Sequence, residues 1–453
     1  DSSTSRGLGD VYKRQEKSRT CILRRMTIQC KIVRKIVQYK ERRYFSMQTD
    51  VIIVGGGASG LVTAVMCARA GKRVLLFEQK KQIGKKLLAT GNGKCNYTNK
   101  NQTEACYRSE NKGFPQYGLS AFGYKEAISF FEELGITPKE KQGYIYPYSE
   151  QAVAFVEVLE MEIKKRNVQV CYEKVVQIQQ KKNGKFCVLT EQASYQSEKL
   201  VLATGGKASP KLGSDGSGYV LAKQMGHKII TPVPALIGLK CREDFYETVA
   251  GVRIQAKVTL YIESMEQAIA EDTGELQLTN YGISGIPVFQ ISRYAARAIE
   301  EEKSVYAKLD FMPAFSKIEL EKICRSRFSR SEISAEQALI GLLNKKLIQL
   351  VLHKSGIRAK QKANKVNEMQ CKQLVNTLKG MKMQIIGTNG FEHAQVTAGG
   401  VDTVEIDNKT MESKVVKGLY FTGEIMDVDG ICGGYNLQWC WSSAYLASTA
   451  ICK

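Results

Sequence analysis

The chain has 453 residues, of which 43% are hydrophobic and 25% charged, and its 66 basic and 45 acidic residues give a formal charge of +21. This composition is typical of a soluble globular protein and excludes a disordered, collagen-like or coiled-coil chain. No apolar run approaches the roughly 18 to 20 residues that cross a bilayer, so we expect no membrane segment. The length predicts two or three domains with room for a cleft between them.

The first of two basic segments is residues 1–46, with 13 Lys and Arg against 4 Asp and Glu. Its first fifteen residues resemble read-through from a cloning or sequencing adapter, and we exclude them from the fold. The Arg-rich, acid-poor stretch that follows has an alternative interpretation as a transit peptide or a membrane-surface helix. We predict that residues 1–46 are a non-native or disordered leader.

In chain order, the first predicted element is a buried strand at residues 50–54. The sequence Gly55-Gly-Gly-Ala-Ser-Gly60 follows it and leads into a helical pattern, and a second strand then ends at Glu78. Gly55 permits the tight turn, Gly57 lets a pyrophosphate approach the backbone, and Gly60 lets the helix pack on the strand. Glu78 can accept hydrogen bonds from ribose hydroxyls and would repel a 2'-phosphate, which favours FAD or NAD over NADP. The predicted contacts of this turn also include Ala58, Ser59 and Gln79.

Two later segments are predicted to return to the same site. A strand at residues 200–203 ends in Thr204, Gly205 and Gly206. A second strand ends in Gly423 and Glu424, and a glycine-rich turn then leads through Gly434, Tyr435 and Asn436 into the last helix. The unsatisfied N–H groups at that helix end can stabilise the negative charge of a reduced flavin, which NAD does not require.

The second basic segment is residues 314–383, with 15 Lys and Arg against 5 Asp and Glu. Apolar residues at helical spacing from Ala338 to Val351 predict a helical insert. Its charge could serve RNA, an acidic electron donor, the phosphates of NAD(P)H, or solubility alone. Phe315 and Phe328 are its only aromatic residues, so a base-stacking platform is not expected and we predict no nucleic-acid partner.

The 13 cysteines form no CxxC pair and there are only three histidines. The sequence therefore predicts no metal site, no disulfide framework and no His-based triad, and it favours a reducing, cytoplasmic location. We expect the chemistry to come from a bound cofactor.

Several motifs together resemble those of the bacterial BaiN/RdsA family of NAD(P)/FAD-dependent oxidoreductases, also described as aminoacetone-oxidase-like, within the glutathione-reductase-like flavoproteins. They stand in the family's order along residues 50–450: GKKLLATGNGKCNYTN at 84–99, YIYPYSEQA at 144–152, GELQLTNYGISG at 274–285, VTAGGV at 396–401 and TMESK at 410–414. Lys94 and Cys432 depart from the family pattern, which usually has Arg and Thr there.

The resemblance implies roles for further residues. Lys86, Asn92, Gly93 and Asn96 would form the loop beside the flavin. Val175 would meet the adenine through its backbone, and Glu424 would hold the ribityl chain.

The expected fold is α/β, with a discontinuous Rossmann-like FAD-binding domain at residues 47–207 and 401–453. A β-rich substrate domain is expected at 208–313 and 384–400, and the basic helical insert at 314–383. The sequence indicates no particular oligomeric state.

We expect an FAD-dependent oxidoreductase that takes electrons from transiently bound NADH or NADPH, because no second GxGxxG is present. The resemblance implies reduction of a C=C bond in a small apolar substrate, steroid or bile-acid-like. Tyr281 and Tyr435 are the candidate catalytic proton donors. The alternatives are a flavin amine oxidase that uses oxygen and a flavin-bearing protein that binds or modifies RNA through the basic insert.

Overall fold

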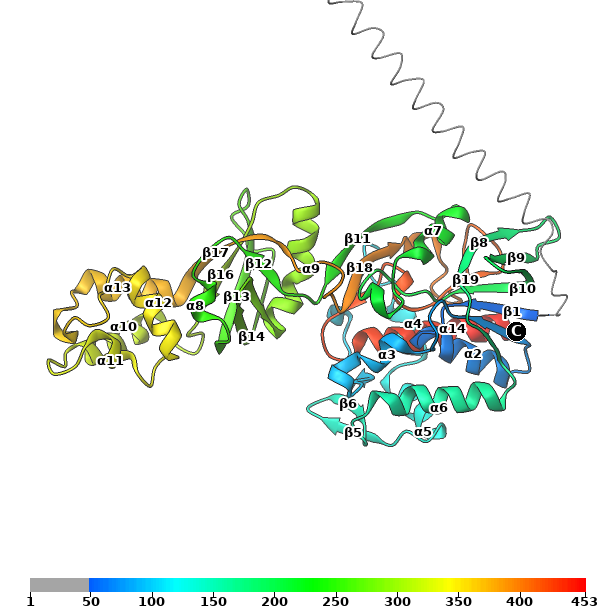
Figure 1. The fold of residues 1–453 in the computed structure, drawn as a ribbon, viewed down its shortest axis with the longest axis horizontal. Helices are drawn as coiled ribbons and strands as arrows, with labels where there is room; N and C mark the ends of the chain where they lie inside the picture. The colour runs from blue at the N-terminus through cyan, green and yellow to red at the C-terminus, as the bar shows by residue number, and fades with distance from the viewer. Residues whose placement is uncertain (1–48) are drawn as a thin grey trace, which may run out of the picture.

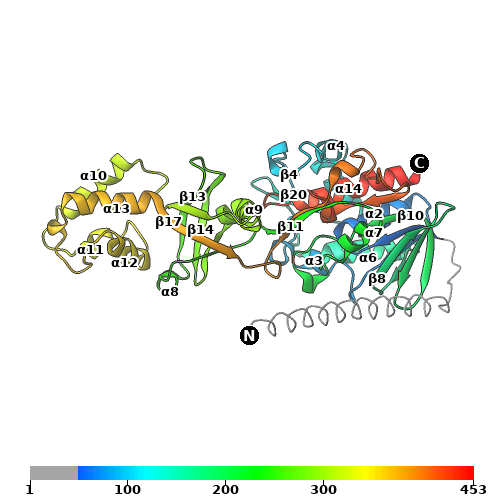
Figure 2. The ribbon, with the colours of Figure 1, turned by 90° about the horizontal axis from the view of Figure 1, so that it is seen from above.

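The computed structural model describes residues 49–453, so the predicted leader lies outside the described residues. Figure 1 shows an elongated molecule in which an α/β unit, a β-barrel and a group of helices follow one another along the long axis. The view from above in Figure 2 shows the same succession, with α9 (Ile286–Glu300) at the junction between the α/β unit and the barrel.

The central sheet of the α/β unit has seven strands: β1 (Thr49–Val54), β2 (Val74–Phe77), β7 (Gln169–Cys171), β8 (Val175–Gln180), β9 (Phe186–Thr190), β10 (Ser194–Leu202) and β19 (Leu419–Phe421). The parallel part has the order β7, β2, β1, β10, and β19 pairs with the end of β10. The last residue of β1, Val54, is paired with Phe77 on one side and Leu202 on the other. The turn after β1 therefore lies at the carboxyl edge of the sheet, where α/β proteins bind ligands.

Helices from the N-terminal and C-terminal parts of the chain pack around this sheet. They are α2 (Ala58–Arg69), α3 (Lys85–Leu88), α4 (Gln116–Ala121), α5 (Tyr124–Glu133), α6 (Ala152–Lys165), α7 (Ser217–Gln224) and α14 (Tyr435–Cys452). Helices α2 and α14 pack against each other. One hydrophobic core runs from Val51 to Ala222 and resumes from Val401 to Ile451, so the C-terminal segment completes the fold that the N-terminal strand begins.

Two small sheets and several short turns of 3-10 helix complete the α/β unit. The sheets are β3 (Thr98–Asn99), β6 (Tyr144–Pro147) and β5 (Pro138–Lys141), and β4 (Tyr107–Arg108) with β20 (Asp429–Gly430). The 3-10 turns of this unit are η1 (Thr90–Gly93), η2 (Glu104–Cys106), η3 (Pro210–Leu212), η5 (Thr403–Glu405) and η6 (Gly423–Ile425).

A two-stranded antiparallel ribbon joins the α/β unit to the barrel. It consists of β11 (Ile229–Ala235) and β18 (Val396–Val401), with Ala235 paired to Val396. The chain leaves the α/β unit along β11 and returns along β18 (Figure 1).

The barrel is closed, with the strand order β12, β15, β14, β13, β16, β17. Its elements are β12 (Leu239–Cys241), α8 (Tyr246–Val249), β13 (Arg253–Ile262), β14 (Ala270–Thr279), β15 (Gly282–Gly285), β16 (Val305–Asp310) and β17 (Met381–Thr388). Helix α9, which the sequence did not predict, packs against β11 and β14. A second hydrophobic core lies inside the barrel and continues into the helices beyond it.

Those helices are α10 (Lys317–Phe328), α11 (Ala335–Leu339), α12 (Lys345–Lys354) and α13 (Glu368–Gly380), with η4 (Ala363–Lys365) between the last two. Ser316, Ser334 and Asn367 each accept a hydrogen bond from the backbone N–H three residues ahead, forming the capping boxes that begin α10, α11 and α13. The stretch predicted to be helical, residues 314–383, contains all of these helices.

The predicted α/β fold class is confirmed, since the parallel sheet and its glycine turn form a Rossmann-type unit. Two elements depart from the predicted segments. Helix α7 lies in the stretch assigned to the β-rich domain, yet Tyr219 and Leu221 belong to the α/β core. Strand β17 begins at Met381, inside the stretch assigned to the helical insert, because Met383 and Ile385 fill the barrel core.

Candidate functional site

The turn between β1 and α2 is shaped by its glycines. Gly55 has a φ of +113°, and a Cβ there would lie 2.4 Å from the carbonyl oxygen of Ala203. A Cβ on Gly60 would lie 1.9 Å from the carbonyl oxygen of Gly55, whereas one on Gly57 would meet no atom within 4 Å. Gly55 and Gly60 therefore allow close packing of strand, turn and helix, while the space beside Gly57 is open to a ligand.

Glu78 follows β2 and reaches the same turn. Its Oε2 accepts a hydrogen bond from the N–H of Gly56 at 3.0 Å, and its Oε1 accepts one from the N–H of Lys80 at 2.7 Å. Burial raises the pKa of the Glu78 carboxyl above its usual value, and these backbone hydrogen bonds oppose the shift. A carboxylate at this point of a dinucleotide fold is placed to accept hydrogen bonds from ribose hydroxyls.

A large pocket opens beside the glycine turn and includes about 1130 Å³ of empty space, part of it open to solvent. The predicted site residues that line it are Gly55, Gly57, Ala58, Ser59, Glu78, Gln79, Lys86, Val175, Thr204, Gly205, Glu424 and Asn436. The structure thus brings the N-terminal turn, the end of β10 and the start of the last helix to one cavity, which is large enough for a cofactor.

Lys86 and Glu424 meet across this pocket, although 338 residues separate them in sequence. Lys86 Nζ lies 2.7 Å from Glu424 Oε2, and the side chains are 26% and 15% exposed. The other carboxylate oxygen, Oε1, accepts a hydrogen bond from the N–H of Thr397 at 2.7 Å. Glu424 is therefore fixed by a cation and by strand β18 at once.

The first two turns of α14 face the pocket through Asn436, Leu437 and Cys440. Gly434 precedes the helix with a φ of +93°, and a Cβ there would lie 2.8 Å from Asn96 Oδ1. The Oδ1 atom of Asn96 is buried and has no hydrogen-bond partner within residues 49–453. The unsatisfied N–H groups at the start of α14 and the unpartnered Oδ1 atom of Asn96 therefore lie in the same region.

The predicted site residues that do not line the pocket are Gly60, Asn92, Gly93, Asn96, Gly206, Tyr281, Gly423, Gly434 and Tyr435. Two of these residues, Gly206 and Gly423, pack closely against side chains at or beside the pocket wall. A Cβ on Gly206 would lie 2.4 Å from Thr397 Oγ1, and one on Gly423 would lie 2.6 Å from Ser59 Oγ. Asn92, with a φ of +54°, and Gly93 lie in the exposed turn η1.

The two candidate tyrosines are not brought together. The Tyr435 hydroxyl donates a hydrogen bond to the carbonyl oxygen of Asn101 at 2.9 Å, and the residue is 5% exposed. Tyr281 lies in the turn between β14 and β15, where a Cβ on Gly238 would be 2.6 Å from its hydroxyl oxygen. Neither hydroxyl reaches the pocket, so the geometry gives no support to a role in proton donation for either tyrosine.

Sequence reasoning missed a segment of the wall that precedes and includes the start of α7. Leu212, Gly213, Ser214 and Ser217 line the pocket, and Gln79 Nε2 donates to the carbonyl oxygen of Gly213 at 2.5 Å. The signal was present as a run of Gly and Ser, GSDGSG at 213–218, before a helical pattern. A glycine-rich segment before a helix is also the signal that identified the entries to α2 and α14.

The pocket residues fit a bound dinucleotide such as FAD. Gly57 leaves open space beside the start of α2, and Glu78 is placed for a ribose. Thr204 Oγ1 and Ser214 Oγ are buried in the wall without a hydrogen-bond partner in the described structure, so each can bond to a ligand. Fold and site together define the class as an FAD-dependent oxidoreductase of the Rossmann type.

Comparison with known proteins agrees with this class. A model of the HI0933-like protein Rossmann domain matches residues 49–450, and the chain belongs to this family. It is 44% identical over 401 residues to the 3-dehydro-bile acid delta(4,6)-reductase of Clostridium scindens, covering 88% of this chain and 98% of that protein. It is 35% identical over 415 residues to the ribosomal RNA dihydrouridine synthase of Haemophilus influenzae, covering 90% of this chain and 100% of that one.

Among solved structures, a 3-ketosteroid-delta4-(5alpha)-dehydrogenase from Rhodococcus jostii is 14% identical, with a TM-score of 0.46 over 91% of this chain and 98% of that chain. The family resemblance expected from the motifs is confirmed by the family model and by the 44% identical relative. Within residues 49–453, no helix combines the length and apolar character that crossing a bilayer requires. The same part of the chain has no group of three or more His, Cys, Asp or Glu side chains placed to hold a metal ion.

Proposed function

We propose that this enzyme uses NADH or NADPH to reduce a C=C bond conjugated to a ketone in a steroid or bile-acid-like substrate. One observation carries the proposal. The pocket built from the glycine turn, Glu78 and α14 stands in a chain that is 44% identical to a bile-acid reductase over nearly the whole length of both proteins. Bound FAD supplies the two-electron carrier for such a reaction.

The chain's own residues bind and orient the cofactor in this proposal. The N-terminus of α2 and the open space at Gly57 take the pyrophosphate, and Glu78 takes the adenosine ribose. Val175, which lines the pocket, meets the adenine, and the Lys86–Glu424 pair lies beside the ribityl chain. The N–H groups of the first turn of α14 stabilise negative charge at the flavin ring.

The test is anaerobic reduction of purified protein loaded with FAD. We expect a flavin spectrum that bleaches with NADH or NADPH and returns when a 3-oxo-4,6-diene bile acid is added. Absence of a flavin spectrum after FAD is supplied contradicts the cofactor assignment. A spectrum that returns only with oxygen, together with peroxide release, favours the amine-oxidase alternative instead.

A second candidate function is reduction of uridine in RNA. It is favoured by the dihydrouridine synthase relative and by four exposed cations on and after α12: Lys354, Arg358, Lys360 and Lys362. The two candidates share their chemistry, because the C5=C6 bond of uracil is also conjugated to a carbonyl group. They differ in whether the helical insert binds the phosphates of an RNA.

RNA retention at increasing salt separates the two candidates. If RNA is the substrate, replacing these four cations with Gln should weaken binding and lower the salt dependence, since fewer phosphate counterions are released. The matched control replaces four exposed lysines of the α/β unit, which are Lys81, Lys112, Lys125 and Lys182. Equal RNA binding by both variants and the wild type would exclude the helical insert as an RNA site.

A further inference from the structure

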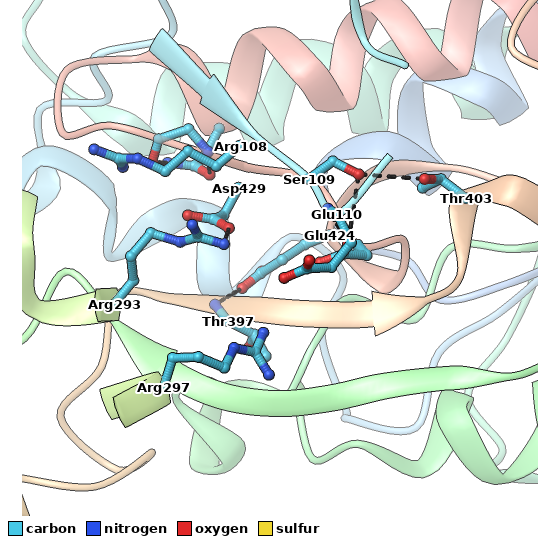
Figure 3. Close-up of polar contacts among 12 residues, drawn as sticks. Arg108, Ser109, Glu110, Arg293, Arg297, Thr397, Thr403, Glu424 and Asp429 are labelled. Carbon is cyan, nitrogen blue, oxygen red and sulfur yellow. Dashed lines mark hydrogen bonds and ion pairs between the residues drawn. The ribbon is translucent and has the colours of Figure 1, made fainter. Parts of the chain in front are cut away.

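A cluster of charged side chains lies where α9 meets β4 and β20, outside the set of residues that line the pocket (Figure 3). Arg108 and Asp429 face each other across the two strands. Arg293 of α9 places its terminal nitrogen 3.1 Å from Asp429 Oδ1, and the two side chains are 14% and 1% exposed. The cluster therefore holds an almost fully buried carboxylate and a guanidinium brought in by the neighbouring unit.

The cluster is tied directly to the pocket through Asn436. The Asn436 side chain accepts a hydrogen bond from the N–H of Gly430 at 2.8 Å and donates one to its carbonyl oxygen at 2.9 Å. Gly430 follows Asp429 in β20, and Gln290 of α9 accepts a hydrogen bond from the N–H of Cys432 at 3.0 Å. Strand β20 thus lies between the first turn of α14, which faces the pocket, and α9.

One aromatic ring holds two of the guanidinium groups. Arg108 and Arg293 lie 5.5 and 5.3 Å from the centroid of the Tyr294 ring. Arg108 also approaches the carbonyl oxygen of Gln290 at 3.4 Å. Contact with a ring face restricts a long side chain at low cost, so both guanidinium groups are held in place before any ligand arrives.

Two guanidinium donors of α9 are buried without an acceptor. Within residues 49–453, Arg293 Nε and Arg297 Nη2 donate no hydrogen bond. Arg297 lies one helical turn beyond Arg293, and its other terminal nitrogen donates to the carbonyl oxygen of Thr231 at 2.6 Å. A buried donor without an acceptor destabilises the fold, so these two donors on one helix face are available to a ligand oxygen.

The charge in the cluster also favours an incoming negative group. Arg293 and Arg108 act electrostatically on the buried carboxylate of Asp429, and Arg293 and Arg297 act on that of Asp427. Burial raises the pKa of Asp429 to about 6 and raises that of Asp427 above its usual value, while the arginines oppose both shifts. The three partly buried arginines thus outnumber the two buried carboxylates on which they act.

We propose that Arg293 and Arg297, with Arg108 beside them, bind the ketone oxygen of the substrate; this inference rests on the proposed function. Hydride from the reduced cofactor forms a C–H bond at the far carbon of the conjugated double bond. The π electrons of the C=C bond then shift to give an enolate with its negative charge on the oxygen. A proton from water adds to the carbon next to the carbonyl group, which forms the second C–H bond and restores the ketone. Fixed guanidinium donors stabilise that oxygen where its charge develops.

The first test compares Arg297→Gln with Arg253→Gln. Arg297→Gln leaves the Arg293–Asp429 ion pair intact, and Arg253 is a surface arginine of β13, 62% exposed. We expect Arg297→Gln to slow reduction of the ketone about 100-fold. It should also weaken binding of the ketone to the oxidised holoenzyme, measured by calorimetry, and leave FAD content unchanged. Arg253→Gln should behave like the wild type, and equal behaviour of both variants overturns the inference.

Arg293→Lys and Arg293→Gln form the second test. Lys keeps the positive charge and the pair with Asp429, so it should recover part of the activity that Gln loses. Equal losses in Lys and Gln, with unchanged ketone binding by calorimetry, would show a role in packing only and overturn the inference.

A bile acid also carries a carboxylate, so the acid and its neutral amide are compared as substrates. If the arginines bind the ketone, the loss caused by Arg297→Gln is the same for both. A loss seen only with the acid assigns the site to the carboxylate and overturns the inference. If the wild type reduces no conjugated ketone at all, the proposed function fails, and this outcome is distinct from a failure of the arginine variants alone.

Discussion

A Cβ added to Gly60 at the start of α2 would lie 1.9 Å from a backbone oxygen, whereas a Cβ added to Gly380 at the end of α13 would meet no atom within 4 Å. The same contrast holds for charge. Lys86 and Glu424 form a half-buried pair in the α/β unit, while Arg325 and Glu368 of the helical insert are 49% and 60% exposed. Both regions have an apolar core, but the α/β unit adds close backbone approach and a partly buried ion pair, whereas the insert adds helix caps and exposed ion pairs.

The largest effect is expected from Gly60→Ala, which disturbs the close backbone approach in the α/β unit. The added methyl group forces α2 away from the turn, so we expect FAD affinity to fall by more than about 100-fold, or roughly 3 kcal/mol. Gly380→Ala is the matched control and should leave FAD affinity and stability nearly unchanged, because alanine favours a helix. FAD titration and thermal melting of both variants measure the difference. If both variants retain FAD equally, the turn can accommodate a Cβ at residue 60 and the prediction is wrong.

The next effect concerns Asp429, whose pKa is raised by burial from its usual value of 3.8 to about 6. Between these values the folded protein binds more protons than the unfolded chain, so this group's contribution to stability falls as pH rises. The loss between about pH 4 and pH 6 should be on the order of 2 to 3 kcal/mol. Arg293, Arg108 and Asp427 also face this carboxylate, so the wild type is compared with Asp429→Asn, which lacks the titration. Parallel stability curves for the two proteins would contradict the prediction.

A smaller effect is expected from Glu424→Gln. The amide keeps an acceptor for the N–H of Thr397 but loses the charge that pairs with Lys86. Leaving a half-buried cation without its partner should lower FAD affinity about 10-fold, or roughly 1.4 kcal/mol. Glu368→Gln in the helical insert is the control, because exposed ion pairs contribute little. Fluorescence titration of free FAD checks both, and unchanged affinity in Glu424→Gln would separate this pair from the cofactor site.

The smallest effect is expected from the helical insert itself. Ser316→Ala removes the side chain that accepts a hydrogen bond from the N–H of Glu319 at the start of α10. The stability should fall by about 1 kcal/mol in urea titration, with FAD affinity unchanged. Ser329→Ala, at the other end of the same helix, is the control because it caps no N-terminus. A change in FAD affinity would show that the insert is coupled to the pocket.

The parts of the site that could be predicted from sequence are those formed by residues that are close together in the chain. The glycine turn and the entry to α14 each carry their signal within ten residues, since backbone conformation and helix ends are local properties. The Lys86–Glu424 ion pair and the contact of Gln79 with Gly213 are not local, and no spacing rule encodes them. The arginine cluster was missed for the same reason, because Arg293 and Asp429 come from segments that lie far apart in the sequence.

The ribbon of β11 and β18 also bears on how such enzymes diversify. Residues 236–395 leave and re-enter the α/β unit at Ala235 and Val396, which are direct partners in one antiparallel ladder. A segment whose two ends are already adjacent can be lengthened, trimmed or exchanged in evolution without altering the register of the sheet that holds the cofactor. Transplanting residues 236–395 between relatives at this pair would test whether this segment sets the substrate range while the α/β unit keeps its register.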